Sequence, residues 1–149
     1  ATKKVDAGDI LAQKSIPILP DDTYLSLEKK LIPLGSQMLL SILPQYLAGA
    51  IEVKTQNEDA ATYAKKIKKE DGLIEWSDSP EFIKRMVRAY DPWPGTYTKF
   101  SISKILKIKK VEVENGKLKI ITVQPEGKKE MPYEAFLRGH KNFVLCTSV

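Results

Sequence analysis

Residues 104–124, KILKIKKVEVENGKLKIITVQ, carry the pattern that decides the fold. Apolar and polar side chains alternate on both sides of Asn115-Gly116, and this period of two is typical of β-strands. Asn-Gly is the residue pair that favours the tight turn of a two-residue hairpin. The stretch therefore predicts two antiparallel strands joined at Glu114-Asn115-Gly116.

The segments on either side of this hairpin predict more strand and two helices. Residues 96–102 predict a preceding strand, and Ser79 or Asp78 can cap an earlier helix that has Pro80 at its first position. Two prolines and a glycine in residues 91–95 end that helix. A short helix near 132–138 and an edge strand over 142–149 complete the pattern. We expect a small, abbreviated β-barrel or curled sheet with one preceding helix.

The N-terminal third predicts a strand followed by one long helix. Residues 10–19 are β-branched and apolar in rough alternation, and an Asp-Asp pair then offers a helix N-cap. Apolar residues recur at helical spacing over 25–47 with one broad face to bury, and Gly49 suits the C-cap. Pro33 and Pro44 are expected to kink or interrupt this helix. Since the strand and helix have no partner strands here, we expect them to be the tail of a larger sheet domain.

Composition limits the classes of protein to which the chain can belong. It has 149 residues, of which 42% are apolar, so the composition favours a folded core over wholesale disorder. The single cysteine, Cys146, excludes an internal disulfide framework and a cysteine-based metal site, and a reducing cytoplasm fits best. No apolar run is long enough to span a bilayer. We expect no membrane association and no metal.

Positive charge is concentrated in the second part of the chain. Residues 1–60 carry 6 Lys/Arg and 8 Asp/Glu, whereas residues 61–149 carry 18 and 11. Such asymmetry points to a polyanionic partner, although a solvated basic surface is the more frequent explanation. The candidate cations for phosphate contacts are Lys65, Lys66, Lys68 and Lys69 in a polar linker, Arg85 and Arg88 on the helix, Lys107 and Lys109 on one strand face, and Lys128 and Lys129.

Aromatic residues and the one histidine are weaker indications of nucleic-acid binding. Trp93, Tyr97 and Phe100 can stack on bases, but aromatic residues beside proline are more often buried, so Trp76 and Trp93 are expected in the core. His140 lies in a polar turn with no catalytic partner nearby in the sequence. It is expected to be an exposed polar residue or an RNA contact.

One acidic turn is a candidate for catalysis. Asp6 and Asp9 flank Gly8, and a carboxylate in such a loop can orient water, assist proton transfer or hold a metal. The same pattern is common in ordinary turns, so the residues alone favour a structural role. The chain contains no phosphate-binding glycine loop, no Cys/His metal spacing and no serine nucleophile motif, and therefore no complete catalytic set.

Four blocks, read in order, resemble one family. They are VDAGDILAQKSIPI, QNEDAATYAKKIKKEDGLIEW, IKRMVRAYDPWPGTYT and VQPEGKKEMPYEAFLRGH, and together they are similar to the second half of methionyl-tRNA formyltransferases. The resemblance implies an α+β chain in three parts. Residues 1–50 would be the tail of a Rossmann-like formyltransferase domain, 51–70 a basic linker, and 71–149 an OB-like tRNA-binding domain. Within the linker, the residues themselves favour a helical turn around 60–66.

The resemblance also implies a reaction. That family transfers a formyl group from 10-formyltetrahydrofolate to the methionine amine of initiator tRNA, using Asn, His and Asp. Only the aspartate has a counterpart, Asp6, because the family's Asn and His lie upstream of this chain. We therefore expect the chain alone to be inactive, to bind no folate and to remain a monomer that binds initiator tRNA through its linker and barrel.

Other functions remain open on the sequence alone. A related formyltransferase that modifies an amino-sugar nucleotide shares the Asp-x-Gly and Pro-Trp-Pro-Gly blocks, although the lysine-rich linker favours the tRNA enzyme. A stand-alone, non-catalytic nucleic-acid module is a second alternative. A structural domain with no nucleic-acid role is a third, and it predicts no salt-dependent RNA binding.

Overall fold

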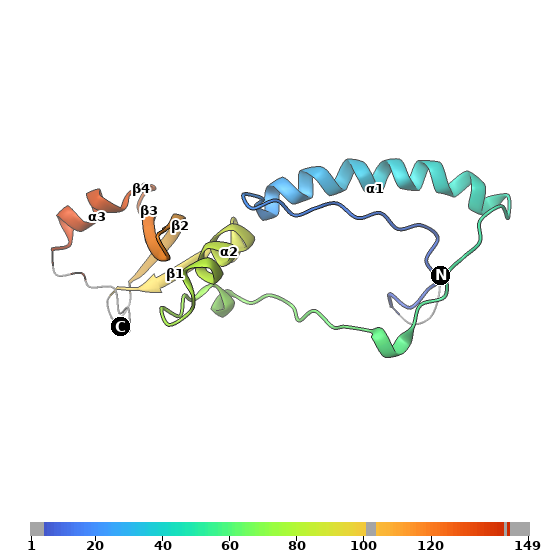
Figure 1. Cartoon of the computed structure of the whole chain (residues 1–149). Coiled ribbons are helices and arrows are strands. Elements are labelled where there is room, and N and C mark those ends of the chain that lie inside the picture. The colour runs from blue at the N-terminus through green and yellow to red at the C-terminus, as the bar shows by residue number, and fades with distance from the viewer. Residues whose placement is uncertain (1–4, 101–103, 142, 144–149) are drawn as a thin grey trace. The chain divides into compact units, whose positions relative to one another are not determined.

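The structure is a computed structural model, and it describes residues 5–100, 104–141 and 143. The chain divides into two compact units, Ala1–Lys65 and Lys66–Val149 (Figure 1). Each unit is described by itself. The edge strand expected over residues 142–149 lies outside the described residues, apart from Phe143.

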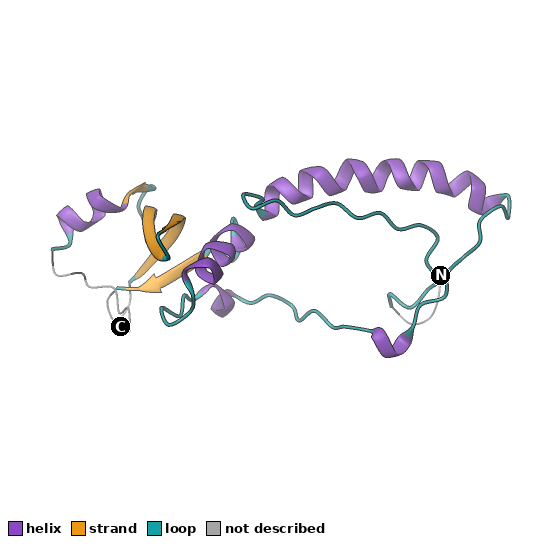
Figure 2. Ribbon diagram, in the orientation of Figure 1, coloured by secondary structure: helices purple, strands orange, loops and turns teal. Residues whose placement is uncertain are grey.

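An antiparallel sheet forms the centre of the C-terminal unit (Figure 2). Its strand order is β1-β2-β3-β4, and β2 and β3 are the two arms of the predicted hairpin. Asn115 and Gly116 both adopt positive φ, 51° and 72°, as a tight turn between twisted strands requires. The hairpin prediction is therefore confirmed, and so is the α+β class. The strands are β1 (Thr96–Lys99), β2 (Ile105–Glu114), β3 (Lys117–Pro125) and β4 (Met131–Pro132).

Two helices pack against this sheet, α2 (Pro80–Tyr90) and α3 (Tyr133–Gly139). Inward-facing residues alternate along β2 and β3, so that Leu106, Ile108 and Val123 are almost fully buried together with Phe136 of α3. Burial of side chains of this size contributes about 1.5–3 kcal/mol each. The core of the unit is completed by Ile74, Ile83, Val87, Val111 and Ile120.

Helix α2 begins where the sequence predicts. The hydroxyl of Ser79 accepts a hydrogen bond from the Phe82 backbone N–H at 3.3 Å, and Pro80 occupies the first turn. Ser79 rather than Asp78 is therefore the N-cap. Ile83 and Val87 of this helix are buried in the core, whereas Phe82 is 46% exposed. The guanidinium of Arg85 lies 5.8 Å from the centre of that ring, which gives it a cationic neighbour in place of the core.

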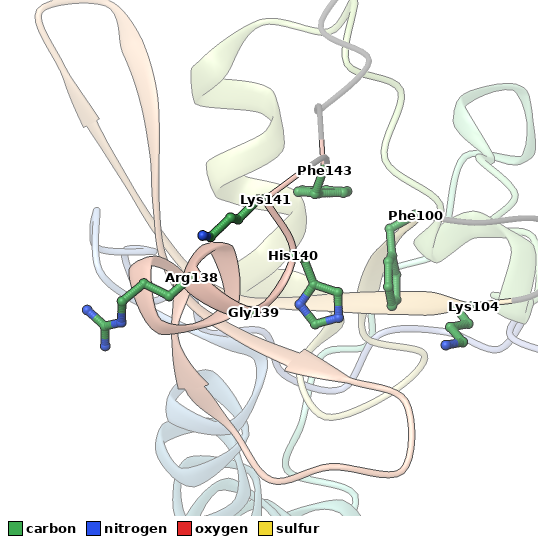
Figure 3. Close-up of a pocket in the computed structure, with 7 residues that line it drawn as sticks. All are labelled: Phe100, Lys104, Arg138, Gly139, His140, Lys141 and Phe143. Atoms are coloured by element: carbon green, nitrogen blue, oxygen red, sulfur yellow. The ribbon is translucent and has the colours of Figure 1, made fainter.

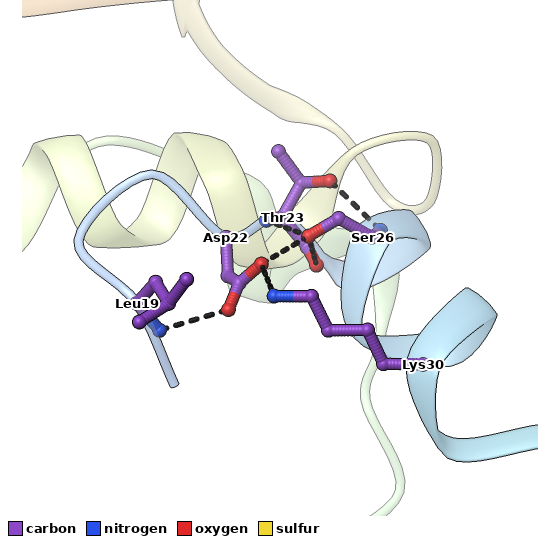
Figure 4. Close-up of polar contacts among 5 residues, drawn as sticks. All are labelled: Leu19, Asp22, Thr23, Ser26 and Lys30. Atoms are coloured by element: carbon purple, nitrogen blue, oxygen red, sulfur yellow. Dashed lines mark hydrogen bonds and ion pairs between the residues drawn. The ribbon is translucent and has the colours of Figure 1, made fainter. Parts of the chain in front are cut away.

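The N-terminal unit is built around α1 (Tyr24–Leu47), which confirms the predicted long helix. Thr23 is its N-cap. The carboxylate of Asp22 accepts hydrogen bonds from Leu19 N at 2.8 Å and Ser26 Oγ at 2.7 Å, and pairs with Lys30 Nζ at 2.6 Å (Figure 4). The Lys30 ammonium, supported by these hydrogen bonds, lowers the pKa of Asp22 to about 2. The carboxylate therefore stays ionised at the start of the helix across the physiological range.

Several expectations for this unit are wrong, beginning with the N-cap of α1, which is Thr23 and not one of the two preceding aspartates. Residues 10–19 do not form a strand, because only Ile10 finds a partner, in an isolated antiparallel bridge with Lys54. The helix is not interrupted at Pro33 or Pro44. The helical turn expected at 60–66 is replaced by a short 3-10 helix, Glu58–Ala60.

The apolar face predicted for α1 exists but is not buried. No residue of the helix is buried, because the described part of residues 1–65 contains no sheet against which it can pack. No helix among the described residues is long and apolar enough to cross a membrane. The most exposed apolar side chains of α1 include Ile32, Leu39, Leu40 and Leu47.

Candidate nucleic-acid interface and the Asp6 loop

A cavity of about 390 Å³ in the C-terminal unit brings cationic and aromatic side chains together. Lys107 follows Leu106 and precedes Ile108, both of which face the core, so its side chain lies on the opposite face of β2. Lys69 and Trp93 reach the same cavity from segments before β1. The residues that line it are Lys69, Trp93, Pro94, Tyr97, Ile105, Lys107, Gln124, Pro125, Glu126 and Gly127.

Strand register explains one side of this cavity. Tyr97 of β1 is paired with Lys107 of β2, and Lys107 is paired with Gln124 of β3. Side chains paired directly across antiparallel strands share a face. The three residues therefore form one row, which gives the cavity a floor of phenol, ammonium and amide groups.

Close backbone packing sets the other side. Lys69 begins the 3-10 helix Lys69–Gly72, and a Cβ on Gly72 would lie 2.1 Å from the carbonyl oxygen of Gly95. The Ile74 N–H bonds to the Tyr97 carbonyl at 2.9 Å, which holds this segment beside β1. Only glycine permits so close an approach, so Gly72 determines how near Lys69 lies to the loop that carries Trp93.

Trp93 is a surface residue, contrary to the prediction that it belongs to the core. Its side chain is 59% exposed, because the prolines on both sides turn the chain outward at the end of α2. Trp76, by contrast, is partly buried against the core, and its indole N–H donates to Thr98 Oγ1 at 3.1 Å. An exposed indole beside ammonium groups suits stacking on a base.

The other predicted cations differ in how available their charges are. Lys65, Lys66 and Lys68 are exposed on the segment that leads to the cavity. Lys109 lies at a bulge in β2, and its ammonium pairs with Asp91 and, at 3.7 Å, with Glu130. Its charge is therefore already balanced by two carboxylates, whereas Lys107 lines the cavity.

The remaining candidates lie on α2 and in the turn after β3. Arg85 is exposed and Arg88 half-buried on the helix. Gln124 of the cavity donates through Nε2 to the Lys128 carbonyl at 3.0 Å, which fixes the turn holding Lys128 and Lys129, both exposed. This turn therefore adjoins the cavity, and the helix residues are not among its lining.

A second hollow, of about 510 Å³, surrounds His140 (Figure 3). The imidazole stacks on Phe136 with ring centres 4.2 Å apart, and its Nδ1 lies 3.0 Å from the Phe136 carbonyl oxygen. His140 is exposed, as predicted. The sequence did not predict this hollow, although four of its lining residues are consecutive, in the run Arg138-Gly139-His140-Lys141. The lining is Phe100, Lys104, Arg138, Gly139, His140, Lys141 and Phe143.

The Asp6 loop belongs to the N-terminal unit. Asp6 is exposed and has a φ of 54°, in the left-handed region. The side-chain amide of Gln56 donates from Nε2 to the carbonyl oxygens of Asp6 at 3.0 Å and Gly8 at 2.6 Å. The Asp6 turn is thus held by a segment about fifty residues later. Among the described residues, no group of three or more His, Cys, Asp or Glu side chains is placed to hold a metal ion.

Comparison with known proteins identifies the class first. Residues 66–117 match the family described as formyl transferase, C-terminal domain, so this part of the chain is similar to the C-terminal domain of formyltransferases. The structure is also similar to that of HypX from Aquifex aeolicus in complex with tetrahydrofolic acid, with a TM-score of 0.64, covering 92% of this chain and 28% of HypX. At 18% identity, that likeness shows the fold alone.

Curated relatives narrow the class to one family. The chain is 37% identical to the methionyl-tRNA formyltransferase of Roseiflexus castenholzii, over 91% of this chain and 51% of the relative. It is also 37% identical to the methionyl-tRNA formyltransferase of Dictyoglomus thermophilum, over 93% of this chain and 53% of that relative. Over most of its length the chain is therefore homologous to methionyl-tRNA formyltransferases. It spans about half the length of the curated relatives it matches.

Proposed function

We propose that the protein to which this chain belongs transfers a formyl group from 10-formyltetrahydrofolate to the methionine amine of initiator Met-tRNA. In this proposal the chain supplies Asp6 and a surface that docks the tRNA. The observation that carries the docking role is the cavity that gathers Lys69, Lys107, Trp93 and Tyr97. The names of the curated relatives support the substrate and the reaction.

Asp6 has the chemistry of a proton-handling group. An ionised carboxylate accepts hydrogen bonds, so it can orient an imidazole and a water while the amine loses its proton. The donor, when bound, supplies the formyl carbon that the amine attacks. We place no folate on this chain and, since the resemblance puts the catalytic Asn and His upstream, propose that the chain alone does not catalyse the reaction.

The docking surface is proposed to bind phosphate and base together. Ammonium groups at Lys69 and Lys107 would neutralise phosphates, with Lys65, Lys66, Lys68, Lys128 and Lys129 extending the positive surface. The indole of Trp93 and the phenol of Tyr97 would receive an unpaired base. Contacts of this kind position the tRNA and carry little sequence information.

The same cavity favours a second candidate, an amino-sugar nucleotide as acceptor. Its volume, about 390 Å³, lies within the ordinary range of small-molecule sites. One stacked base with a diphosphate between Lys69 and Lys107 would occupy it. The two candidates differ in whether cations outside the cavity contribute to binding.

Salt-dependent binding of initiator tRNA tests the docking role. In the intact protein, Lys69→Ala/Lys107→Ala should weaken binding and reduce the slope of log affinity against log salt by about 2, since each lost phosphate contact reduces it by about 1. The matched control is Lys117→Ala/Lys119→Ala, an equal loss of charge at the hairpin tip. Equal slopes for the wild type and the cavity variant, or an equal loss in the control, would contradict the proposal.

A further inference from the structure

We infer that Gln56 is a positioning residue for Asp6, acting through the main chain of the loop and not through the carboxylate. The inference rests on the proposed function, in which Asp6 takes part in formyl transfer. It assigns a role in the reaction to a residue of the QNE block that the docking surface does not use.

The contacts of Gln56 are directed at the Asp6 turn. Its Nε2 carries two protons, and they serve two carbonyl oxygens, those of Asp6 at 3.0 Å and Gly8 at 2.6 Å. Nearby, Ile10 and Lys54 exchange two backbone hydrogen bonds, at 2.8 and 3.0 Å. This bridge brings the Gln56 backbone close to the turn. The Gln56 side chain can therefore bond to the carbonyl groups at both ends of Asp6-Ala7-Gly8.

Asp6 needs such support because of its backbone conformation. A φ of 54° lies in the left-handed region, which non-glycine residues adopt at some cost and aspartate tolerates better than most. Strained residues of this kind persist only where the surroundings hold them. Without the Gln56 bonds, Asp6 can relax to negative φ, and the direction of its Cβ and carboxylate would change.

The expected consequence is a catalytic loss without a binding loss. A displacement of about 1 Å at a reacting group can cost about 100-fold in rate, while tRNA contacts made by the C-terminal unit are unaffected. Gln56→Ala in the intact protein should lower kcat about 10- to 100-fold and leave the KM for Met-tRNA within about twofold. Gln56→Glu should do the same, because a carboxylate presents only acceptors to two carbonyl oxygens.

The matched control is Gln45→Ala. Gln45 also donates from Nε2 to a backbone carbonyl, that of Ser41 at 2.7 Å, in the same unit but on α1. This variant should keep both kcat and KM. Thermal unfolding is measured for each variant. A midpoint close to that of the wild type shows that a lower kcat does not come from a loss of folded protein.

Asp6→Asn, assayed in parallel, separates the positioning role of Gln56 from the catalytic role of Asp6. A large loss of kcat in Asp6→Asn and in both Gln56 variants supports the inference. A loss in Asp6→Asn with unchanged kcat in Gln56→Ala overturns the positioning role and leaves the proposed function standing. Unchanged kcat in Asp6→Asn overturns the positioning role together with the catalytic role proposed for Asp6, because the carboxylate would then take no part in the reaction.

Discussion

Replacing Gly72 with alanine is expected to destabilise the C-terminal unit by about 3 kcal/mol, the upper end of the cost of overpacking a close contact. The added methyl would lie 2.1 Å from the Gly95 carbonyl oxygen and 3.4 Å from Cγ of Pro94. Gly95 cannot easily retreat, because its N–H bonds to the Tyr90 carbonyl at 2.8 Å. The backbone of residues 69–72 would have to move.

Urea unfolding of the intact protein measures this cost, with the indole of Trp76 as a reporter of the core. Gly139→Ala is the matched control, since its new methyl would meet no atom within 4 Å, and it should leave the midpoint nearly unchanged. Because Lys69 lies three residues before Gly72, the variant should also bind tRNA more weakly while folded. Wild-type stability and affinity in Gly72→Ala would refute the account of how the cavity is built.

Replacing Asp6 with asparagine is expected to lower kcat for formyl transfer by about 10²- to 10⁴-fold, the usual contribution of a positioned proton-transfer group. Asparagine has nearly the shape of aspartate, so the loop and its bonds to Gln56 should survive. The amide, however, carries no negative charge and cannot stabilise a neighbouring cation or take a proton. The loss should therefore fall on the chemical step.

Single-turnover formylation of Met-tRNA separates that step from binding and product release. Asp9→Asn supplies the control, because it removes the same charge three residues away and leaves Asp6 in place. A rate for Asp6→Asn within a few-fold of the wild type, or an equal loss in Asp9→Asn, would show that the carboxylate of Asp6 has no specific role.

The parts of the fold that local chemistry determines were predictable from the sequence. Asn115-Gly116 supplied a turn that few other residue pairs can make, and the alternation on both sides left one register for the hairpin. Ser79 and Pro80 similarly combined a hydroxyl cap with a preset φ at the start of α2. In each case the signal lay within a few residues of the feature it determined.

The failures arose where distant partners decide the outcome. Residues 10–19 have strand-like composition, but a strand needs a neighbour, and only Ile10 has one. Trp93 was expected in the core from its type and neighbouring prolines, yet the direction in which the chain leaves α2 places it on the surface. The bulge in β2 that separates Lys109 from Lys107 is a property of pairing with β3 and leaves no mark in the sequence.

The candidate site shows the same division. Sequence identified Lys69, Lys107, Trp93 and Tyr97 as separate residues of suitable chemistry. Their assembly depends on the pairing of β1 with β2 and on the contact between Gly72 and Gly95. The family resemblance pointed to Asp6. Gln56 was not identified, because its role appears only when a carbonyl fifty residues earlier is seen within hydrogen-bonding distance.

Formyl transfer to two acceptors in parallel is the most direct measurement of the central claim. The intact protein would be given 10-formyltetrahydrofolate with either initiator Met-tRNA or an amino-sugar nucleotide, and the formylated product quantified. We predict formyl-Met-tRNA as the product and no formylated sugar. The variant Lys69→Ala/Lys107→Ala should form formyl-Met-tRNA more slowly than the wild type. Formylation of the sugar nucleotide but not of Met-tRNA would contradict the account and assign the cavity to a small nucleotide.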